Sequence, residues 1–384
     1  MSPLADGSPL LVCVGAGGVG KTTLAAAMGV ASARVGRDTL VMTFDPSLRL
    51  KDALGVGEEA REREVRVDLE ADGELYASLL DARLTFDRLI ERYAPDPAAR
   101  QRVLGNRFYQ HLSGSLGGIL EYMAVERLFE VAASGRYQQV VLDTPPTRQA
   151  LDFLEAPARI VGFLDSGALR VALRPWFDAG GRLKATSRLG GLGRRAERFL
   201  DEVVGLDLLR DMAEFFQAFS PLFAGFRERA SQVEELLRSP RTCFVLVAGP
   251  GEERIADTLF FARRLQQAGY RLGPIVVNRV HPEPAEPRWL APPLPVPAAP
   301  PALPAPPKIS SGPGQLDGVD LLAWLGERDR RGLVELARLL SDDQPLVDLP
   351  LRAEEPTDLA SLADLGAELE ERAADWRRYL RREA

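Results

Sequence analysis

The sequence predicts an α/β fold in which helices cover a doubly wound, mostly parallel β-sheet. Short apolar runs recur along the chain, and each is followed by glycine, proline or an acidic residue, as is typical of strands buried on both faces. Helical stretches separate these runs, which indicates crossover connections between parallel strands. A glycine-rich loop joins the first run to the first helix. The predicted strands are residues 9–14, 39–44, 138–142, 242–247, 274–277 and 346–349.

Length and composition exclude several classes of protein. The chain has 384 residues, 46% of them hydrophobic and 27% charged, which is typical of a globular protein with a substantial core. Its formal net charge of -7 argues against a nucleic-acid surface spread over the whole protein, so we expect no nucleic-acid partner. No long apolar run and no basic leader is apparent, which predicts a soluble, cytoplasmic protein.

The cysteine and histidine contents argue against a zinc site. Cys13 and Cys243 are the only cysteines, too few for a disulfide framework or a Cys-only metal site. Both lie inside predicted strands, which favours buried core residues. The two histidines, His111 and His281, are too few and too far apart in sequence to indicate a metal site. We therefore expect no zinc.

Two intervals between predicted strands are longer than a crossover helix needs. We predict one domain over residues 1–384 with helical insertions at about 81–135 and 148–240, which form a helical subdomain at one edge of the sheet. The first long interval also contains an apparent hairpin, residues 64–70 and 74–79, followed by a helix over residues 81–93. The second contains Ser220–Pro221, which predicts that one helix ends there and another begins.

Two further segments have unusual composition. Residues 281–308 hold twelve of the 29 prolines, which predicts a linker or insert that is polyproline II or disordered, and a passive spacer is favoured over a proline-recognition role. Residues 168–199 carry eight basic side chains against two acidic ones. This segment is interpreted as a solvated loop, or alternatively as a surface for anionic lipid or a partner protein.

The glycine-rich loop is the strongest motif. Residues 15–23 read GAGGVGKTT and fit the pattern G-x-x-x-x-G-K-[ST], between a predicted strand and a helix predicted over residues 22–35 and closed by Gly36. Glycines let successive N–H groups point at phosphates, and the helix N-terminus adds its positive dipole end. Lys21 is then expected to bridge the β- and γ-phosphates, and the Thr22 hydroxyl to bind Mg²⁺. The predicted ATP-binding residues are Gly15, Gly17, Gly18, Val19, Gly20, Lys21, Thr22 and Thr23.

Two aspartates complete the predicted site. Asp45 follows a strand that we expect to lie next to the phosphate loop, where its carboxylate would orient an attacking water. Asp143 follows the strand predicted at 138–142, the Walker B position, where a carboxylate holds Mg²⁺ directly or through water. A single aspartate after a strand is more often a turn or cap residue. Two of them at the ends of neighbouring strands favour the catalytic interpretation.

Together these motifs resemble one family, the arsenite-pump (ArsA-like) ATPases, which also includes the eukaryotic targeting ATPase for tail-anchored membrane proteins. The resemblance is carried by residues 15–23, Asp45–Pro46, residues 143–147 (DTPPT) and residues 276–279 (VVNR). It spans residues 9 to about 365, apart from the proline-rich segment.

The resemblance implies a nucleotide-dependent dimer with ATP at the subunit interface. Asp45 would lie in switch I and Asp143 in switch II. Asn278 matches the adenine-contacting Asn of the family, an amide that can pair with adenine, although it can alternatively cap the end of its strand. Pro350 matches the late strand and following loop that pack against the base in the family. The implied partners are a second copy of the chain, or a paralogue, and a client or membrane-associated protein.

The sequence departs from the family pattern at Ala16. The family's loop usually starts Gly-Lys-Gly-Gly, with a signature lysine that reaches the partner's nucleotide, and here that position is alanine. The Cys-x-x-Cys pair of the tail-anchored-protein ATPases and the metalloid-binding cysteines of the pump ATPases are also missing. The departure at Ala16 favours a heterodimer with a paralogue that carries the lysine, or else a homodimer in which an arginine such as Arg148 replaces it.

We therefore expect a Mg²⁺-dependent ATPase with Asp45 and Lys21 as catalytic residues, ATP and Mg²⁺ as cofactors, and dimer closure coupled to a client or partner. One alternative is a positioning ATPase of the MinD/ParA kind, although such proteins lack so long a helical insertion. Another is a nucleotide-binding regulatory subunit that hydrolyses little. GTP is disfavoured, since no Asn-Lys-x-Asp or Thr-Lys-x-Asp occurs.

Overall fold

The chain forms two compact units. The first comprises Met1–Leu80, Val131–Ala150 and Leu236–Ala384, and the second comprises Asp81–Glu130 and Leu151–Glu235. The computed structural model describes residues 7–44, 49–94, 96–107, 109–110, 119–146, 150, 153–159, 162, 211, 215, 223–282 and 318–376.

Several sequence predictions fall on residues outside this described part. They include Asp45, Arg148, the basic segment 168–199, the helix boundary at Ser220–Pro221 and the proline-rich segment from residue 283 onward. The helical insertions at about 81–135 and 148–240, and the single domain over 1–384, stay predictions.

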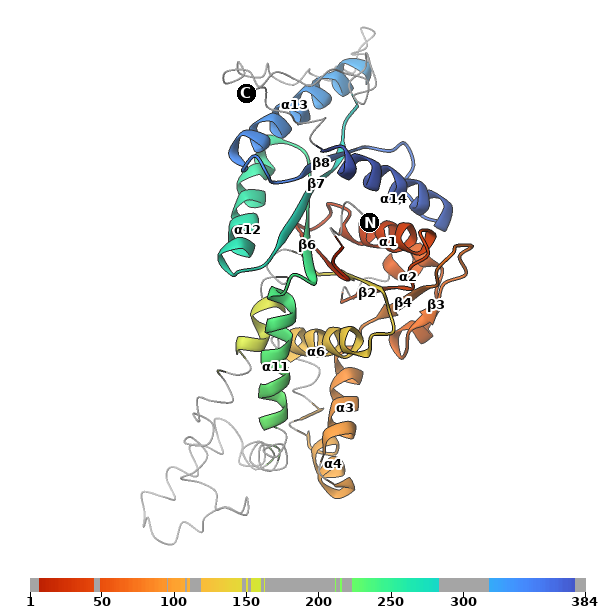
Figure 1. Ribbon diagram of the computed structural model, residues 1–384, viewed down its shortest axis with the longest axis vertical. Coiled ribbons are helices and arrows are strands. Elements are labelled where there is room, and N and C mark those ends of the chain that lie inside the picture. The colour runs from red at the N-terminus through yellow and green to blue at the C-terminus, as the bar shows by residue number, and fades with distance from the viewer. Residues whose placement is uncertain are drawn as a thin grey trace, which may run out of the picture. The chain divides into compact units, whose positions relative to one another are not determined.

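The first unit is built on an eight-stranded sheet, with strand order β3-β4-β2-β5-β1-β6-β7-β8 (Figure 1). All neighbouring strands are parallel except β3 and β4. The predicted α/β fold with a mostly parallel sheet is confirmed. The strands are β1 Leu10–Gly15, β2 Thr39–Thr43, β3 Val65–Arg66, β4 Leu75–Leu79, β5 Gln139–Asp143, β6 Thr242–Ala248, β7 Leu272–Val280 and β8 Leu346–Pro350.

The order of the strands corrects two expectations. The strand before Asp45, β2, does not lie next to β1, because β5 lies between them and pairs with both. The apparent hairpin at 64–79 is also reduced: β3 has only two residues, and β4 pairs in parallel with β2 as a full member of the main sheet. Four of the five β4 side chains are buried, as in a central strand.

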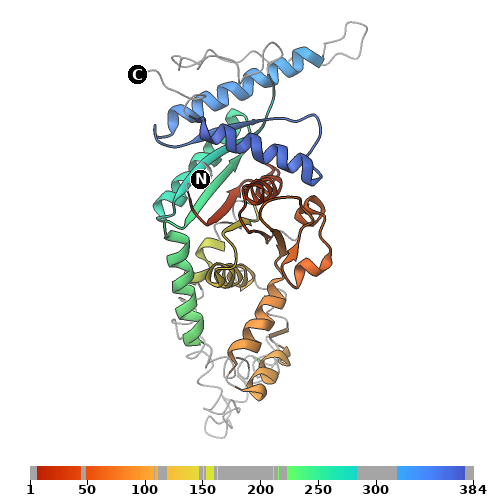
Figure 2. The ribbon, with the colours of Figure 1, turned by 45° about the vertical axis from the view of Figure 1, so that its right-hand side comes forward.

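The helices of the first unit cover this sheet. They are α1 Lys21–Arg34, α2 Arg49–Leu54, α12 Ile255–Gln267, α13 Gly318–Leu339 and α14 Leu359–Ala374, with short 3₁₀ turns η1 Glu58–Arg61 and η4 Glu252–Arg254. Helix α1 lies beside α14 in both ribbon views (Figures 1 and 2). A Cβ on Gly366 would stand 2.5 Å from the Ala27 carbonyl oxygen, so α14 can approach α1 this closely only with glycine there. The alanine-rich α1 is therefore buried almost all round.

The second unit is helical where it is described. Its helices are α3 Ala82–Tyr93 and α4 Pro97–Leu104, with most of α6 Ile119–Ser134 and α11 Phe223–Arg238. The helix predicted at 81–93 is confirmed as α3, and its N-cap, Asp81, accepts a hydrogen bond from the Leu84 N–H at 2.9 Å. None of the helices in the described part of the chain combines the length and apolarity needed to cross a bilayer.

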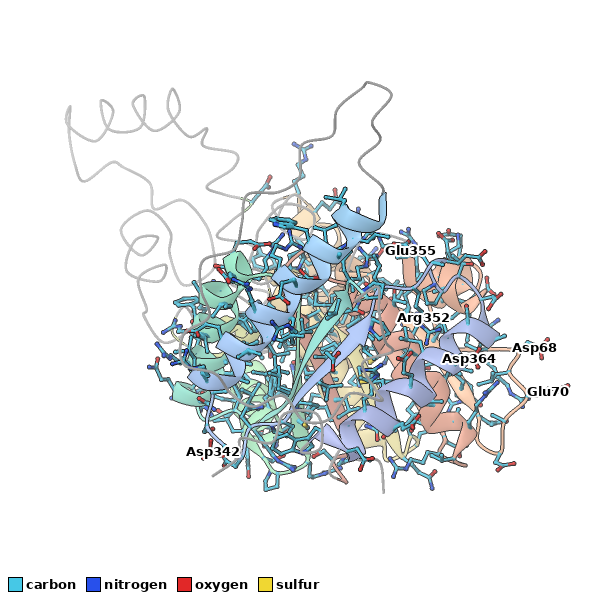
Figure 3. The ribbon with its side chains drawn as sticks, turned by 90° about the horizontal axis from the view of Figure 1, so that it is seen from above. Asp68, Glu70, Asp342, Arg352, Glu355 and Asp364 are labelled. Carbon is cyan, nitrogen blue, oxygen red and sulfur yellow. The ribbon has the colours of Figure 1, made fainter. Side chains whose placement is uncertain are left out.

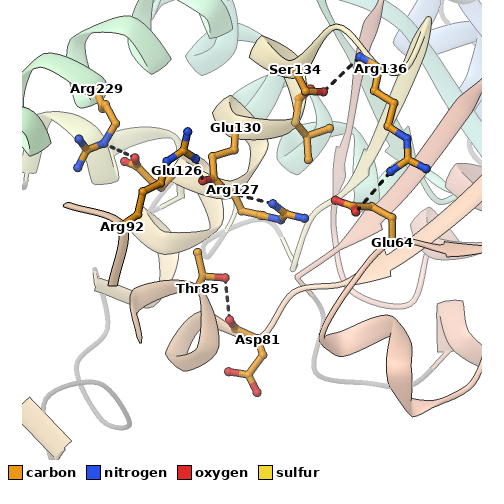
Figure 4. A network of polar contacts seen from close by, with 11 residues as sticks. Glu64, Asp81, Thr85, Arg92, Glu126, Arg127, Glu130, Ser134, Arg136 and Arg229 are labelled. Carbon is orange, nitrogen blue, oxygen red and sulfur yellow. Dashed lines mark hydrogen bonds and ion pairs between the residues drawn. The ribbon is translucent and has the colours of Figure 1, made fainter. Parts of the chain in front are cut away.

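A buried ion pair joins α6 and α11 in this unit. Glu126 accepts hydrogen bonds from Arg229 and from the Tyr122 hydroxyl (2.8 Å), and the Arg229 guanidinium lies 4.0 Å from the centre of the Tyr93 ring. Glu126 and Arg229 are among the residues labelled in Figure 4. Burial raises the pKa of Glu126, although the Arg229 charge opposes this shift.

Candidate nucleotide-binding site

The phosphate loop connects the carboxyl end of β1 to α1 and depends on its glycines. At Gly15, φ is +150° and a Cβ would lie 2.0 Å from the Val247 carbonyl oxygen, so β6 leaves no room for a side chain. At Gly20, φ is +92° and a Cβ would lie 2.4 Å from the Asn278 side-chain nitrogen. Both positions therefore require glycine, and the loop has the tight curl that the motif predicts.

Lys21 is the first residue of α1 and is only 7% exposed. Its Nζ donates a hydrogen bond to the Ala16 carbonyl oxygen at 2.8 Å, which folds the ammonium back over the loop. An ammonium group held there, at a helix N-terminus, makes the loop a positively charged environment suited to phosphate groups.

Asp143, the last residue of β5, connects the loop to β2. Its Oδ2 accepts a hydrogen bond from the Thr22 hydroxyl at 2.8 Å and another from the Thr43 hydroxyl at 2.9 Å. The side chain is fully buried. The strand order explains this arrangement, because β5 lies between β1 and β2, with Asp143 in register with Cys13 on one side and Thr43 on the other.

Hydroxyl and carboxylate oxygens are the protein ligands that Mg²⁺ prefers, so Thr22 and Asp143 fit this metal. Within the described part of the chain, no group of three or more His, Cys, Asp or Glu side chains is placed to hold a metal ion. A magnesium site here would thus use the Thr22 hydroxyl, the Asp143 carboxylate and the phosphates. The expected absence of zinc stays a prediction.

Cys13 lies directly beneath the loop and is chemically quiet. It is fully buried in β1, and burial together with the nearby Asp143 charge raises the pKa of its thiol well above the usual value. Its carbonyl oxygen accepts a hydrogen bond from the Thr144 hydroxyl at 2.7 Å. Cys243 is buried as well, and neither cysteine forms a disulfide.

Asn278, in β7, contacts the phosphate loop. Its side-chain nitrogen donates a hydrogen bond to the Val19 carbonyl oxygen at 2.9 Å. Asn278 does not end its strand, because β7 continues to Val280. Pro350, the last residue of β8, is in register with Val280, and the following Leu351 N–H donates to the Val280 carbonyl oxygen at 2.7 Å. The two residues implied by the family resemblance therefore lie near the ends of neighbouring strands, β7 and β8.

Two residues contact the site although the sequence analysis gave them no role of their own. Thr43 lies inside the strand predicted over residues 39–44, two positions before Asp45, and its hydroxyl donates a hydrogen bond to Asp143. Arg279 follows Asn278, and its Nη1 donates to the Gly18 carbonyl oxygen at 3.3 Å. Arg279 is the last residue of the VVNR motif, but the motif alone does not indicate its contact with the loop, which depends on how β7 pairs with β8.

The chain is similar to known proteins over its first half. Residues 9–179 match the family described as anion-transporting ATPase. This match includes the phosphate loop, Asp45 and Asp143, and it ends before Asn278 and Pro350.

Three fungal proteins named ATPase GET3 are also similar to the chain. The one from Malassezia globosa is 31% identical over 150 residues, covering 38% of this chain and 42% of the relative. The one from Aspergillus terreus is 33% identical over 146 residues, covering 37% of this chain and 41% of the relative. The one from Podospora anserina is 30% identical over 148 residues, covering 38% of this chain and 41% of the relative. The chain thus spans about two-fifths of the length of these relatives.

Proposed function

We propose that this chain is an ArsA-like P-loop ATPase that binds and hydrolyses ATP with Mg²⁺, on the basis that residues 9–179 match the anion-transporting ATPase family. The observation that carries this proposal is the hydrogen bonding of Asp143. Its carboxylate joins the phosphate-loop hydroxyl of Thr22 to the end of β2, after which the family resemblance implies switch I. This connection supports nucleotide binding more than a purely structural role. A buried carboxylate beside a phosphate loop is the arrangement that holds Mg²⁺ and a nucleotide in P-loop ATPases.

The roles of the residues follow from their chemistry. Phosphate-loop N–H groups and the Lys21 ammonium would bind the β- and γ-phosphates, and Thr22 and Asp143 would hold Mg²⁺. When bound, Mg²⁺ neutralises charge on the phosphate oxygens. Asp45 would orient water for in-line attack on the γ-phosphorus, with the bond to the bridging oxygen breaking as the new bond forms. The adenine would lie against Asn278 and Pro350.

Substitution of Asp143 tests this proposal. We expect Asp143→Asn to lower the affinity for ATP measured with Mg²⁺ by about tenfold or more, and to leave the weaker affinity in EDTA nearly unchanged. The matched control is Asp38→Asn, because Asp38 precedes the opposite end of β2 and accepts from the Glu74 N–H at 3.0 Å. Calorimetry that shows equal Mg²⁺-ATP affinity for wild type and Asp143→Asn would refute the magnesium site.

We further propose a nucleotide-switched dimer that acts on a client or membrane-associated protein in the cytoplasm. Its support is the match of residues 9–179 to the family model. Ala16 bears on the choice of partner, because it has no cation to offer to a partner's nucleotide. A heterodimer with a paralogue that carries the signature lysine fits Ala16 best. A weakly hydrolysing regulatory subunit is the second candidate, favoured by the same residue.

A further inference from the structure

The end of β7 contains an irregularity beside the phosphate loop. Val277 is in register with Asp348 and Val280 with Pro350, so three steps along β7 match two along β8 and β7 holds one extra residue. Arg279, within this bulge, has φ of +65° and is the only non-glycine residue with positive φ in the described part of the chain. Such a backbone costs energy for a residue with a Cβ and is commonly kept at functional sites.

The bulge directs two consecutive side chains to one loop. In a regular strand, neighbouring side chains point to opposite faces of the sheet. Here the Asn278 side-chain nitrogen donates to the Val19 carbonyl oxygen at 2.9 Å, and Arg279 Nη1 donates to the Gly18 carbonyl oxygen at 3.3 Å. Two adjacent carbonyl groups of the phosphate loop are therefore held by two adjacent residues of β7.

These contacts orient the N–H groups that phosphates need. In a planar trans peptide, the carbonyl and the following N–H point in opposite directions. Because the Gly18 carbonyl points toward Arg279, the Val19 N–H points away from β7. Likewise, the Val19 carbonyl points toward Asn278, so the Gly20 N–H also points away from β7. Both N–H groups belong to the glycine-rich loop that would bind the phosphates.

Arg279 is itself held in place. Its Nη2 pairs with Glu355 Oε1 at 2.5 Å, and Glu355 lies between β8 and α14, in the segment where Figure 3 labels it together with Arg352. The ion pair is exposed and contributes little to the stability of the fold. It does limit the conformations of the Arg279 side chain. Arg279 thereby links the phosphate loop to the segment that follows Pro350.

We propose that Arg279 is a positioning residue for nucleotide binding, which with Asn278 holds the carbonyls of Gly18 and Val19 so that the next two N–H groups face the phosphates. This inference rests on the proposed function. Arg279 need not contact the nucleotide. It would preorganise the phosphate loop before the nucleotide binds.

The test compares Arg279→Asn and Arg279→Gly with wild type. Both replacements tolerate a positive φ, so they remove the guanidinium without forcing the backbone. The control is Arg271→Asn, because Arg271 donates to Ser8 Oγ at 2.8 Å and to the Pro240 carbonyl oxygen at 3.1 Å, just before β7 begins. The measurements are Mg²⁺-ADP affinity by calorimetry and the melting temperature with and without Mg²⁺-ADP.

We expect both Arg279 variants to bind Mg²⁺-ADP about tenfold more weakly, with an unchanged melting temperature in the absence of nucleotide and a smaller increase on adding it. Arg271→Asn should bind as wild type does. Wild-type affinity in either Arg279 variant would overturn the positioning role while leaving the proposed function intact. A wild-type protein that binds no Mg²⁺-ATP or Mg²⁺-ADP would overturn the proposed function, and this inference with it.

Discussion

Thr22 and Asp143 are 121 positions apart in the sequence, yet a hydrogen bond of 2.8 Å joins the Thr22 hydroxyl to Asp143 Oδ2. The same oxygen accepts from Thr43, so one carboxylate connects the start of α1, the end of β5 and the end of β2. A ligand that changes the position of Thr22 would therefore change the hydrogen bonding of β2. The residues after β2 include Asp45, the proposed water-orienting group, which gives a physical route from nucleotide binding to switch I.

Lys21→Ala should abolish tight binding of Mg²⁺-ATP. The substitution removes the ammonium that lies over the loop, so the phosphate charge is left uncompensated in a partly desolvated site. Lys51→Ala is the matched control, since Lys51 in α2 pairs with Glu58 at the surface. Unchanged ATP affinity in calorimetry for Lys21→Ala would remove the phosphate-loop assignment.

Asp45→Asn should retain ATP binding and lose turnover. An amide can neither accept a proton from the attacking water nor orient it as a carboxylate does. The measurements are ATP affinity and steady-state phosphate release on the same preparation. Hydrolysis at the wild-type rate would show that Asp45 is structural.

Ala16→Lys should raise the ATPase rate of the protein alone. A lysine at this position can neutralise charge in the partner's site, and groups that act in this way are worth up to about three orders of magnitude in rate. The wild-type homodimer should accordingly bind ATP and turn over slowly. A fast wild-type enzyme that the substitution leaves unchanged would exclude the heterodimer proposal and favour an arginine from the chain itself, such as Arg148.

The purified protein should contain no stoichiometric zinc. Its two cysteines are buried in the neighbouring strands β1 and β6, and burial keeps the Cys13 thiol protonated. Elemental analysis after dialysis against a zinc-containing buffer provides the measurement. One zinc per dimer would contradict the argument from cysteine number and burial.

Glu126→Ala should destabilise the second unit by about 3 kcal/mol or more, because it leaves the Arg229 charge buried without its carboxylate. Glu130→Ala is the control, since Glu130 pairs with the exposed Arg92 and with Arg127, and its loss should cost less than about 1 kcal/mol. Chemical denaturation followed by circular dichroism measures both stabilities (Figure 4 labels Glu126, Glu130 and their arginine partners). Equal stabilities would mean that the buried pair contributes no more than the exposed one.

Local sequence determined much of this protein. Buried strands are short and continuously apolar, and a glycine-rich loop between a strand and a helix has few conformations open to it, so the fold class and the loop could be predicted from neighbours in the chain. The placement of Asp143 at the end of a buried strand, and the helix that begins after Asp81, could be predicted for the same reason. Each depends on interactions within a few residues.

The tertiary structure decided which strands are neighbours and where side chains from distant segments meet. That β5 separates β1 from β2, so that Thr43 reaches Asp143, depends on long-range packing that no local pattern encodes. The bulge that directs both Asn278 and Arg279 to the phosphate loop arises from the pairing of β7 with β8, whose partner residues lie about seventy positions apart. Strand register is set by the whole sheet, and the contacts that shape this site depend on it.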